Sequence, residues 1–367
     1  MNSKTVKTGK KIIHVVQHLA PGGIESLTLE MLRFANPEDQ LLIVSLEGNK
    51  KDALEIWPRL REYHKQMIFM DKAPGVQPRV VLNLLRTFQC LRPDVVHTHH
   101  LGPLIYAGVA AKLADINVHI HTEHDAWHLT NNKHKRLQRW LMKLTQPVMV
   151  ADAMLVKQQL DNLFRYHRTV VIKNGIDCNK FYPASQTLAR VHFDLPIDRR
   201  IIGCAGRLEK VKDQKTAIKA MKFLPEDTLL VIAGDGSQRT ALTHLVQFLD
   251  LQHRVIFIGQ TDQMTLFYQA LDVFCMPSLM EGLPLSLLEA QACNIPVVTT
   301  DVGASSEAVC PHTGKFIKVG DVPGLAATLL QTLNQSRVKQ PREFVLKNFE
   351  IRDMAKAYHT LALGGPL

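Results

Sequence analysis

Two glutamates, Glu281 and Glu289, frame the stretch EGLPLSLLEAQA. Paired carboxylates serve as acid and base in glycoside chemistry, where they lie about 5 to 9.5 Å apart. Eight residues along a helix span about 12 Å, which is too far for that pairing. The spacing instead favours a ligand long enough to touch both carboxylates.

The chain between the two glutamates is expected to pass from a loop into a helix. The preceding run LDVFCMPS predicts a strand, and the Leu-rich part predicts a helix with Pro284 in its first turn, where its missing N–H is not needed. A helix start favours negative charge, so we expect the anionic part of the ligand there. The residues concerned are Gly282, Leu283, Pro284 and Leu285. In a structural alternative, Glu281 only caps the helix and Glu289 is exposed.

Two cations follow another predicted strand, in GRLEKVKDQ. Arg207 leaves the strand end and Lys212 comes five residues later. Such cations can neutralise a diphosphate, Arg207 through its planar fork and Lys212 as a point charge. Because Lys210 and Lys215 are nearby, a solvated basic loop is an equal alternative.

Two glycine-containing turns are weaker candidates. Gly22 and Gly23 open a predicted helix that carries Glu25 in its first turn, and such glycines let a backbone approach a phosphate. The PGG sequence is also an ordinary turn. AGDGS (233–237) lacks the third glycine of a dinucleotide fingerprint, because Arg239 stands there. A simple strand-to-helix turn is the better interpretation of that segment.

Histidines gather at two predicted strand ends, VHTHH (96–100) and HIHTEHD (119–125). Neighbouring side chains of a strand point to opposite faces, so these histidines cannot all converge. We therefore predict no metal site, and no D-x-D sequence supports one. His124, placed beyond its strand, is kept as a functional candidate, whereas His119 and His121 are expected to be core or surface residues.

These residues need a scaffold, and alternating β-branched and amphipathic segments predict two α/β units with parallel sheets. Polar, Pro-containing sequence at 174–199 predicts the linker. Predicted helices include 24–34, 79–91, 101–113 and 133–144. Predicted strands are 11–17, 40–46, 66–70, 94–99, 117–122, 169–174, 200–207, 228–236, 254–260, 271–278 and 295–300.

Composition agrees with a two-domain globular protein. The 367 residues are 46% hydrophobic and 21% charged, which suits two domains of roughly 180 residues each. The six cysteines are scattered singly, so neither a disulfide framework nor a zinc site is expected. We expect a cytoplasmic protein with no signal peptide and no membrane-spanning helix.

Basic charge is concentrated in the first half of the chain. Residues 1–180 hold 25 Lys and Arg against 16 Asp and Glu, and the remainder holds 19 against 18. Within the first half, residues 131–146 interleave five basic residues with Leu and Trp, as in a helix lying on an anionic membrane. A helix packed on its own sheet is an equal alternative. With only 6% aromatic residues, recognition of nucleic acid is not expected.

Taken in chain order, the motifs of this sequence resemble those of the GT-B-fold retaining glycosyltransferases with an E-x7-E motif, of the family 4-like type. The motifs are PGGIE, DVVHTHH, HTEHD, NGID, GRLEKVKD, AGDGSQR, FIGQ and DVFCMPSLMEGLPLSLLEAQACNIPVVTT. The resemblance implies two Rossmann-like domains that face each other across a cleft. It places an acceptor-side domain at 1–180, a nucleotide-sugar domain at 195–345 and a helical tail at 346–367.

The resemblance also implies roles for individual residues. Glu281 would contact the donor sugar, Glu289 the ribose, Arg207 and Lys212 the diphosphate, and His124 would lie by the donor sugar. Domain closure would bring the Gly22–Gly23 loop to the donor.

The implied reaction moves a sugar from a nucleoside diphosphate sugar, most commonly a UDP-sugar, to a glycan or lipid-linked acceptor, with retention and without metal or cofactor. This function belongs to surface polysaccharide, lipopolysaccharide or glycolipid biosynthesis, and the enzyme would be cytoplasmic or peripheral at the membrane. Two alternatives stay open: a sugar-nucleotide epimerase, and a non-catalytic basic protein that binds membrane or nucleic acid.

Two residues depart from the family pattern. Lys157 stands where members have a serine, so it is left out of the site. Asn294 replaces a glycine, and asparagine tolerates the same left-handed backbone.

Overall fold

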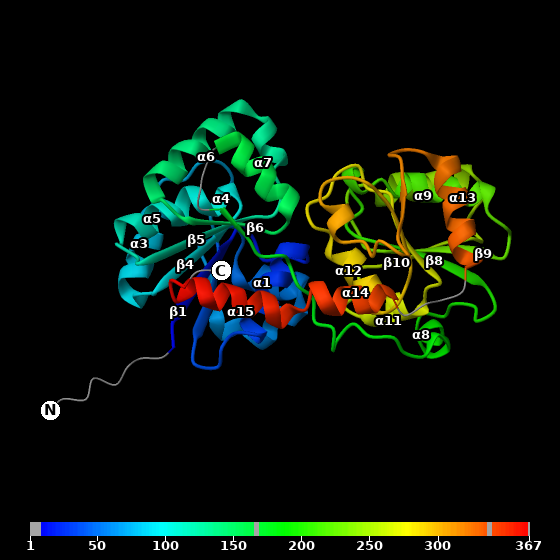
Figure 1. The fold of residues 1–367 in the computed structure, drawn as a ribbon, viewed down its shortest axis with the longest axis horizontal. Coiled ribbons are helices and arrows are strands. Elements are labelled where there is room, and N and C mark those ends of the chain that lie inside the picture. Colours follow the sequence, from blue (N-terminus) through cyan, green and yellow to red (C-terminus); the bar gives the residue numbers. More distant parts are fainter. Residues whose placement is uncertain (1–8, 165–168, 336–339, 366–367) are drawn as a thin grey trace. The chain divides into compact units, whose positions relative to one another are not determined.

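The computed structural model describes residues 9–164, 169–335 and 340–365, and the chain forms two compact units (Figure 1). Unit 1 comprises residues 1–175 and 351–367, and unit 2 comprises residues 176–350. Each unit is built around one parallel sheet with helices on both faces. The α/β class and the two Rossmann-like units predicted from the sequence are confirmed.

The sheet of unit 1 has seven parallel strands in the order β3-β2-β1-β4-β5-β6-β7. Its strands are rich in Val and Ile because both faces of the sheet are covered. The short strand β6 (VMVA) was missed in the sequence because it follows directly on a predicted helix. The strands are β1 (Lys11–Val16), β2 (Gln40–Ser45), β3 (Met67–Phe69), β4 (Val95–His99), β5 (Val118–Glu123), β6 (Val148–Ala151) and β7 (Thr169–Val171).

Helices cover the two faces of this sheet with different sets of side chains. Ile13 and Val15 of β1 face the helix α3 layer, whereas Ile12 and Val16 face a core shared with α1 and the C-terminal helix α15. The helices are α1 (Gly23–Arg33), α2 (Lys50–Ile56), α3 (Arg79–Leu91), α4 (Leu101–Pro103), α5 (Val109–Leu113), α6 (Asn132–Thr145), α7 (Met154–Phe164) and α15 (Ile351–Ala362), with the 3-10 segments η1 (Pro58–Gln66) and η3 (Trp127–Thr130).

The helix predicted over 101–113 is interrupted. A π-helical segment, η2 (Leu104–Gly108), separates α4 from α5. Pro103 lies where the regular pattern changes, and proline cannot donate a backbone hydrogen bond to the preceding turn. Such π segments are local departures that hydrophobic periodicity does not reveal.

The sheet of unit 2 has six parallel strands in the order β10-β9-β8-β11-β12-β13. The three-residue strand β13 was not predicted. The strands are β8 (Arg200–Ala205), β9 (Thr228–Ala233), β10 (Val255–Gly259), β11 (Val273–Met276), β12 (Val297–Thr300) and β13 (Lys315–Ile317). The helices are α8 (Gln186–His192), α9 (Gln214–Ala220), α10 (Arg239–Phe248), α11 (Met264–Ala270), α12 (Leu285–Ala292), α13 (Val322–Leu333) and α14 (Gln340–Asn348), with the 3-10 turns η4 (Lys210–Lys212), η5 (Met221–Phe223) and η6 (Ser305–Glu307).

Both sheets reverse their strand order at one point, between β1 and β4 in unit 1 and between β8 and β11 in unit 2. Ligands of open parallel sheets bind beyond the carboxyl ends of the strands at such a point. The candidate residues of each unit should therefore lie at these two strand pairs.

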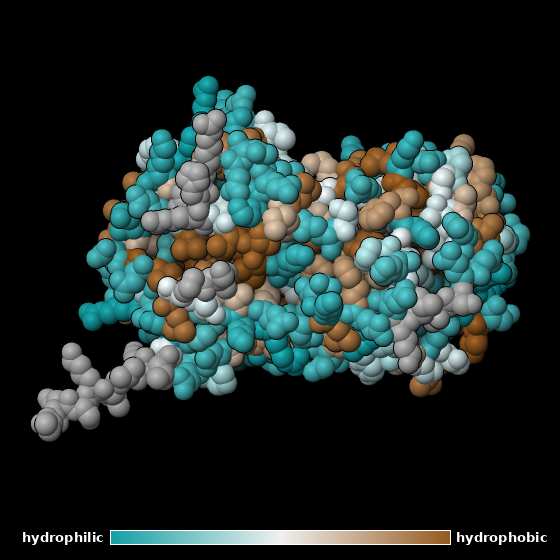
Figure 2. Space-filling view, viewed as in Figure 1, coloured by the Kyte–Doolittle hydropathy of each residue, from teal (hydrophilic) through white to brown (hydrophobic). Residues whose placement is uncertain are grey.

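The surface is mixed in polarity. Hydrophilic side chains cover much of the face seen in Figure 2, with apolar patches between them. Within the described residues, no helix is both long enough and apolar enough to cross a membrane.

Candidate functional site

In unit 2, the loops that follow the neighbouring strands β8 and β11 bring a cation and a carboxylate together. Lys212 Nζ donates a hydrogen bond to Glu281 Oε1 at 2.6 Å. Leu279 N also donates to Val211 O at 2.8 Å, so the two loops are joined through their backbones. The sequence separates these residues by about 70 positions, and the strand order places them side by side.

The charged groups of this site differ in exposure. The Glu281 side chain is 6% exposed and that of Lys212 is 25% exposed, while Arg207 is exposed. A buried carboxylate that is held by a half-buried ammonium fixes the ammonium in place. The exposed side chain of Arg207 is accessible to an anion from solvent, and a Cβ added at the preceding Gly206 would lie 3.8 Å from Lys212 Cε.

The loop carrying Glu281 is fixed by its neighbours after β12. Thr300 Oγ1 donates to Ser278 O at 2.6 Å, and Ala304 N donates to Gly282 O at 3.1 Å. Gly303 has φ +55°, and a Cβ added there would lie 1.7 Å from the Glu281 carbonyl oxygen. Only glycine allows this approach without displacing the loop.

Glu289 lies in a different environment from Glu281, as the spacing predicted. Helix α12 begins at Leu285, so Glu281 precedes the helix and Glu289 lies within it. Tyr268 Oη donates to Glu289 Oε2 at 2.7 Å. Burial, together with the Glu289 carboxylate, raises the pKa of Tyr268 well above its usual range. Pro284 is the N-cap residue and not part of the first turn, a shift of one residue.

The AGDGS segment is the strand-to-helix turn that the sequence predicted, between β9 and α10. Its glycines allow two loops to touch. A Cβ at Gly234 would lie 2.1 Å from Gly206 O, and one at Gly236 would lie 2.7 Å from Leu208 O. Ser237 Oγ also donates to Glu209 at 2.8 Å. These contacts support the loop that presents Arg207.

In unit 1, Gly22 and Gly23 open α1 as predicted. Gly22 is the N-cap in extended backbone, and Gly23 is the first helical residue and is exposed. Glu25 lies in the first turn, 3.5 Å from His18 Nε2. Because a Cβ at Gly22 would lie 2.2 Å from Glu25 Oε2, the glycine leaves space for that carboxylate.

His124 follows β5 directly, beyond the end of the strand as predicted, and its residue surface is 4% exposed. Its Nε2 lies 3.1 Å from His99 Nδ1, and its Nδ1 lies 3.5 Å from Asp152 Oδ2. Burial lowers the pKa of His124 to about 3.

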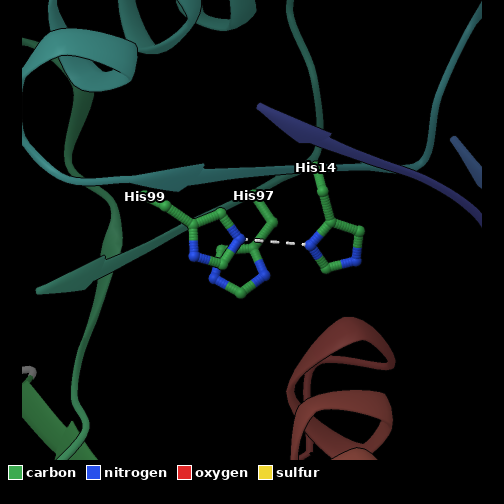
Figure 3. A group of neighbouring side chains, drawn as sticks. All are labelled: His14, His97 and His99. Atoms are coloured by element: carbon green, nitrogen blue, oxygen red, sulfur yellow. Dashed lines mark hydrogen bonds between the residues drawn. The ribbon is translucent and has the colours of Figure 1, made fainter. Parts of the chain in front are cut away.

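The strand order gathers three more histidines on one face of the sheet, as Figure 3 shows. His97 and His99 lie two residues apart on β4, and His14 of β1 is in register with His97. His14 Nδ1 lies 3.3 Å from His99 Nε2, and one ring nitrogen from each residue lies within 4.8 Å of the others. We call His14, His97 and His99 the histidine cluster.

Burial keeps the histidine cluster neutral. Each of its residues is at most 2% exposed. Burial lowers the pKa of His14 to about 4 and those of His97 and His99 well below the usual range. The two strand-end groups are visible in the sequence, but His14 was missed because its contribution depends on the pairing of β1 with β4.

The histidines of β5, His119 and His121, are core residues, one of the two placements that the sequence predicted. His119 and His121 point to the opposite face from His97 and are buried, each within hydrogen-bond distance of Thr98 Oγ1. His121 Nε2 also lies 3.0 Å from Glu123 Oε1. Burial alone would raise the pKa of Glu123, but hydrogen bonds from His100 and His121 lower it below its usual range.

The two residues that depart from the family pattern have local explanations. Lys157 lies on α7 and forms an i,i+4 ion pair with Asp161. Asn294 has φ +62°, so it occupies the left-handed region that was expected from glycine at this turn.

Two family models match this chain and together cover most of it. The model described as "Glycosyl transferases group 1" matches residues 186–348. The model described as "Glycosyltransferase Family 4" matches residues 21–180. The first match includes Arg207, Lys212, Glu281 and Glu289, and the second includes the histidine-rich strand ends.

Proteins with similar sequences include known glycosyltransferases. The chain is 24% identical to an Escherichia coli UDP-Gal:alpha-D-GlcNAc-diphosphoundecaprenol alpha-1,3-galactosyltransferase, over 95% of both chains. It is 24% identical to a Corynebacterium glutamicum GDP-mannose-dependent monoacylated alpha-(1-6)-phosphatidylinositol monomannoside mannosyltransferase, over 90% of both. A crystal structure of Anabaena HepE with UDP and glucose superposes with a TM-score of 0.85 at 18% identity, covering 97% of this chain and all of the other.

Proposed function

The chain belongs to the glycosyltransferases that these two family models describe, and from this membership we propose that it moves a sugar from a UDP-sugar to a lipid-linked or glycan acceptor. The pairing of Lys212 with Glu281 at 2.6 Å, where the strand order of unit 2 reverses, is the observation that carries the proposal.

The charges of unit 2 suit the departure of a nucleoside diphosphate. As the bond to the sugar breaks, negative charge develops on the leaving phosphate. Arg207 and Lys212 stabilise that charge, and the ammonium is oriented in advance by Glu281. Two cations balance much of a diphosphate's charge, which supports the proposal that transfer needs no metal ion.

The two glutamates take different parts of the donor in this proposal. Glu281, which is buried in the loop before α12, accepts hydrogen bonds from the sugar hydroxyls. Glu289, within α12 and held by Tyr268, accepts from the ribose hydroxyls. The backbone from Gly282 to Leu285 lies between them at the start of the helix. Net retention of the anomeric configuration is part of the same proposal.

The proposal also assigns roles to residues of unit 1. His124, beside the donor sugar, and the Gly22–Gly23 loop, on the diphosphate, are the roles that the family resemblance implies. Because His124 is proposed to lie beside the donor sugar, a His124→Ala variant is expected to lower transfer activity. Activity equal to that of the unaltered enzyme would remove His124 from the proposed site.

The choice of UDP rests on the names of similar proteins. The Escherichia coli relative uses UDP-galactose, whereas the Corynebacterium relative uses GDP-mannose. Both act on lipid-bearing acceptors by their names. We therefore place the enzyme in surface polysaccharide or glycolipid biosynthesis.

A thermal-shift screen tests the donor. A ligand that binds only the folded state raises the apparent Tm, so UDP and UDP-sugars should raise it more than GDP, ADP or TDP and their sugars. Lys212→Ala should abolish the shift and the transfer reaction. Lys215→Ala is the matched control, because Lys215 is 62% exposed and lies three residues away. Full activity of Lys212→Ala or Arg207→Ala would overturn the diphosphate assignment.

We also propose that helix α6 of unit 1 rests on an anionic membrane surface. Leu137, Trp140 and Leu144 are 37%, 57% and 38% exposed, although they are apolar. Their spacing of three and four residues puts them on one face of the helix. That face is separate from the packed one, which carries Gln138, Leu141, Met142 and Thr145.

Basic residues flank this exposed apolar face. Lys133, Arg136 and Lys143 are exposed beside it. An apolar stripe with adjacent basic residues suits the boundary between lipid headgroups and acyl chains. The alternative of an ordinary packed helix would leave the apolar stripe unexplained.

Co-sedimentation with vesicles tests this surface. Binding to vesicles that contain phosphatidylglycerol should weaken in Arg136→Gln/Lys143→Gln and in Trp140→Ala. Lys215→Gln/Lys219→Gln removes the same charge from exposed residues of α9 and should bind like the unaltered protein. No binding at low salt would overturn the proposal.

A further inference from the structure

The histidine cluster belongs to unit 1, whereas Arg207, Lys212, Glu281 and Glu289 belong to unit 2. It is formed by β1 and β4 at the point where the strand order of unit 1 reverses, on the face covered by α15 (Figure 3). We infer that His14, His97 and His99 form a binding site for one zinc ion, held by three imidazoles with a fourth position open to a small cavity.

The spacing of the ring nitrogens is the first support. Zn–N bonds of about 2.0 to 2.1 Å in tetrahedral geometry place two ligand nitrogens about 3.3 Å apart. His14 Nδ1 and His99 Nε2 are 3.3 Å apart. The three nitrogens lie within 4.8 Å of one another, so closing the set needs a movement of about 1.5 Å. Rotation of one imidazole ring supplies a movement of that size.

The second support is the set of contacts made by the ring nitrogens of His97 and His99 that would not bind the metal. Metal-bound imidazoles usually engage their other ring nitrogen, which fixes the ring and the tautomer. His97 Nε2 lies 2.7 Å from Thr122 Oγ1, which in turn lies 3.0 Å from Tyr358 Oη of α15. His99 Nδ1 lies 3.1 Å from His124 Nε2.

A carboxylate lies near the second of these contacts. His124 Nδ1 lies 3.5 Å from Asp152 Oδ2, and Asn174 Nδ2 donates to the same oxygen at 2.8 Å. The Asp152 carboxylate supplies negative charge in the surroundings of a buried dication.

A cavity beside the cluster provides the open position. It has a volume of about 30 Å³ and is lined by His14, His97 and Tyr358, among other residues. This volume holds a water molecule. Asp39 also lines the cavity and accepts from His359 Nδ1 at 2.8 Å, which places a second carboxylate near the site.

The chemistry of the ligands selects zinc. Imidazole nitrogen suits Zn²⁺, and three histidines plus water form a common tetrahedral set. A zinc ion there would join β1 to β4 and, through Thr122, to α15.

Metal analysis of the full chain, purified without a histidine tag, tests the site. About one zinc per chain is expected by plasma mass spectrometry, and Co²⁺ substitution should give the visible absorption of a four-coordinate site. His14→Gln and His99→Gln should each lower zinc affinity at least tenfold and abolish the cobalt bands.

The matched control is His119→Gln. His119 is a buried histidine of the neighbouring strand that points to the opposite face of the sheet, and its variant should keep both zinc and the cobalt spectrum. If the cluster variants fail to fold, Thr122→Val and Tyr358→Phe provide the second measurement. Each removes an outer hydrogen bond and should weaken zinc binding about tenfold.

Three outcomes would overturn the inference. Less than about 0.1 zinc per chain, with no cobalt spectrum at about 100 µM added Co²⁺, would show a metal-free hydrogen-bonded core. Zinc retained in His99→Gln would place the ion elsewhere. Zinc lost equally in His119→Gln would show a general effect of folding. Because the readout is metal content and spectrum, the result does not depend on the proposed donor.

Discussion

The two points of reversed strand order use opposite chemistry. In unit 2, the loops after β8 and β11 present charged, partly exposed groups, with Lys212 on Glu281 and Arg207 in solvent. In unit 1, β1 and β4 carry buried, neutral imidazoles. The same topology thus presents charged groups in unit 2, where we propose that the donor diphosphate binds, and buried imidazoles in unit 1, where we infer a zinc site.

The distribution of histidines makes the same contrast. Those of unit 2, at positions 192, 244, 253 and 312, are all exposed. The histidines of β1, β4 and β5 are all buried. Variants of the charged groups Lys212 and Glu281 should therefore change activity more than stability, and variants of the buried histidines of β1, β4 and β5 should do the reverse.

Glu281→Gln is expected to have the largest effect on activity. It keeps the shape of the side chain but removes the charge that holds Lys212. Misplacing a catalytic cation by about 1 Å costs about 100-fold in rate, so kcat should fall by about that factor. Steady-state kinetics with the donor and a thermal melt of the same sample measure both consequences.

If the Glu281→Gln enzyme keeps an unaltered kcat, the pair of Lys212 and Glu281 serves the structure and not the reaction. The contrast drawn between unit 2 and unit 1 would then fail. Glu226→Gln is a suitable control: Glu226 also pairs with a basic residue, Arg254, but its side chain is 82% exposed. That variant should keep the activity of the unaltered enzyme.

The sequence was enough to predict which elements of unit 2 carry the candidate residues, because these residues belong to short contiguous motifs. EGLPLSLLEAQA places Glu281 before a helix and Glu289 within it, and both were confirmed. The strand-to-helix alternation also gave the bounds of the predicted strands within three residues. Short strands such as β6 and β13 carry too few residues for a periodic pattern.

The histidine cluster could not be predicted in the same way. His97 and His99 share a face by their spacing, but His14 joins them only because β1 pairs with β4 in one register. A slip of one residue would turn His14 to the other face. Strand register depends on the whole sheet, and no local pattern encodes it.

Gly303→Ala should have the next largest effect, on both activity and stability. The added Cβ would lie 1.7 Å from the Glu281 carbonyl oxygen, at a backbone φ of +55°. Relieving that overlap must move the loop that carries Glu281. We expect a loss of stability of about 1 to 3 kcal/mol and a fall in activity of about tenfold.

The Gly259→Ala variant distinguishes the effect of atomic overlap from the effect of backbone strain. Gly259 has φ +73°, but a Cβ there meets nothing within 4 Å. The Gly259→Ala variant should lose about 1 kcal/mol of stability through backbone strain, while its activity stays unchanged. Denaturant unfolding and donor kinetics measure the two variants together, and equal effects on activity would contradict the role assigned to Gly303.

Acid should destabilise unit 1 before unit 2 through buried histidines such as His119. Burial lowers the pKa of His119 to about 3, so the unfolded chain binds the proton more readily than the folded one. The stabilisation is complete above pH 6.5 and is lost as the pH falls toward 3. At pH 5 the loss is about 2 kcal/mol for this one group.

Hydrogen exchange between pH 7 and pH 5, corrected for the intrinsic rate, locates this effect. Protection of β5 should fall more than protection of β9, and His119→Gln should reduce the difference. Equal losses of protection in both strands would contradict the assignment to buried histidines.

Tyr268→Phe should have the smallest effect and compares the two units most directly. It removes the hydroxyl that donates to Glu289 at 2.7 Å, so stability should fall by about 1 kcal/mol. Because Glu289 is proposed to hold the ribose, the KM for the donor should rise a few-fold while kcat is kept. Tyr358→Phe removes a comparable hydroxyl in unit 1, 3.0 Å from Thr122 Oγ1, and should lower stability by a similar amount without changing the donor KM. A donor KM that rises equally in both variants would show that it follows stability and not the contact with Glu289.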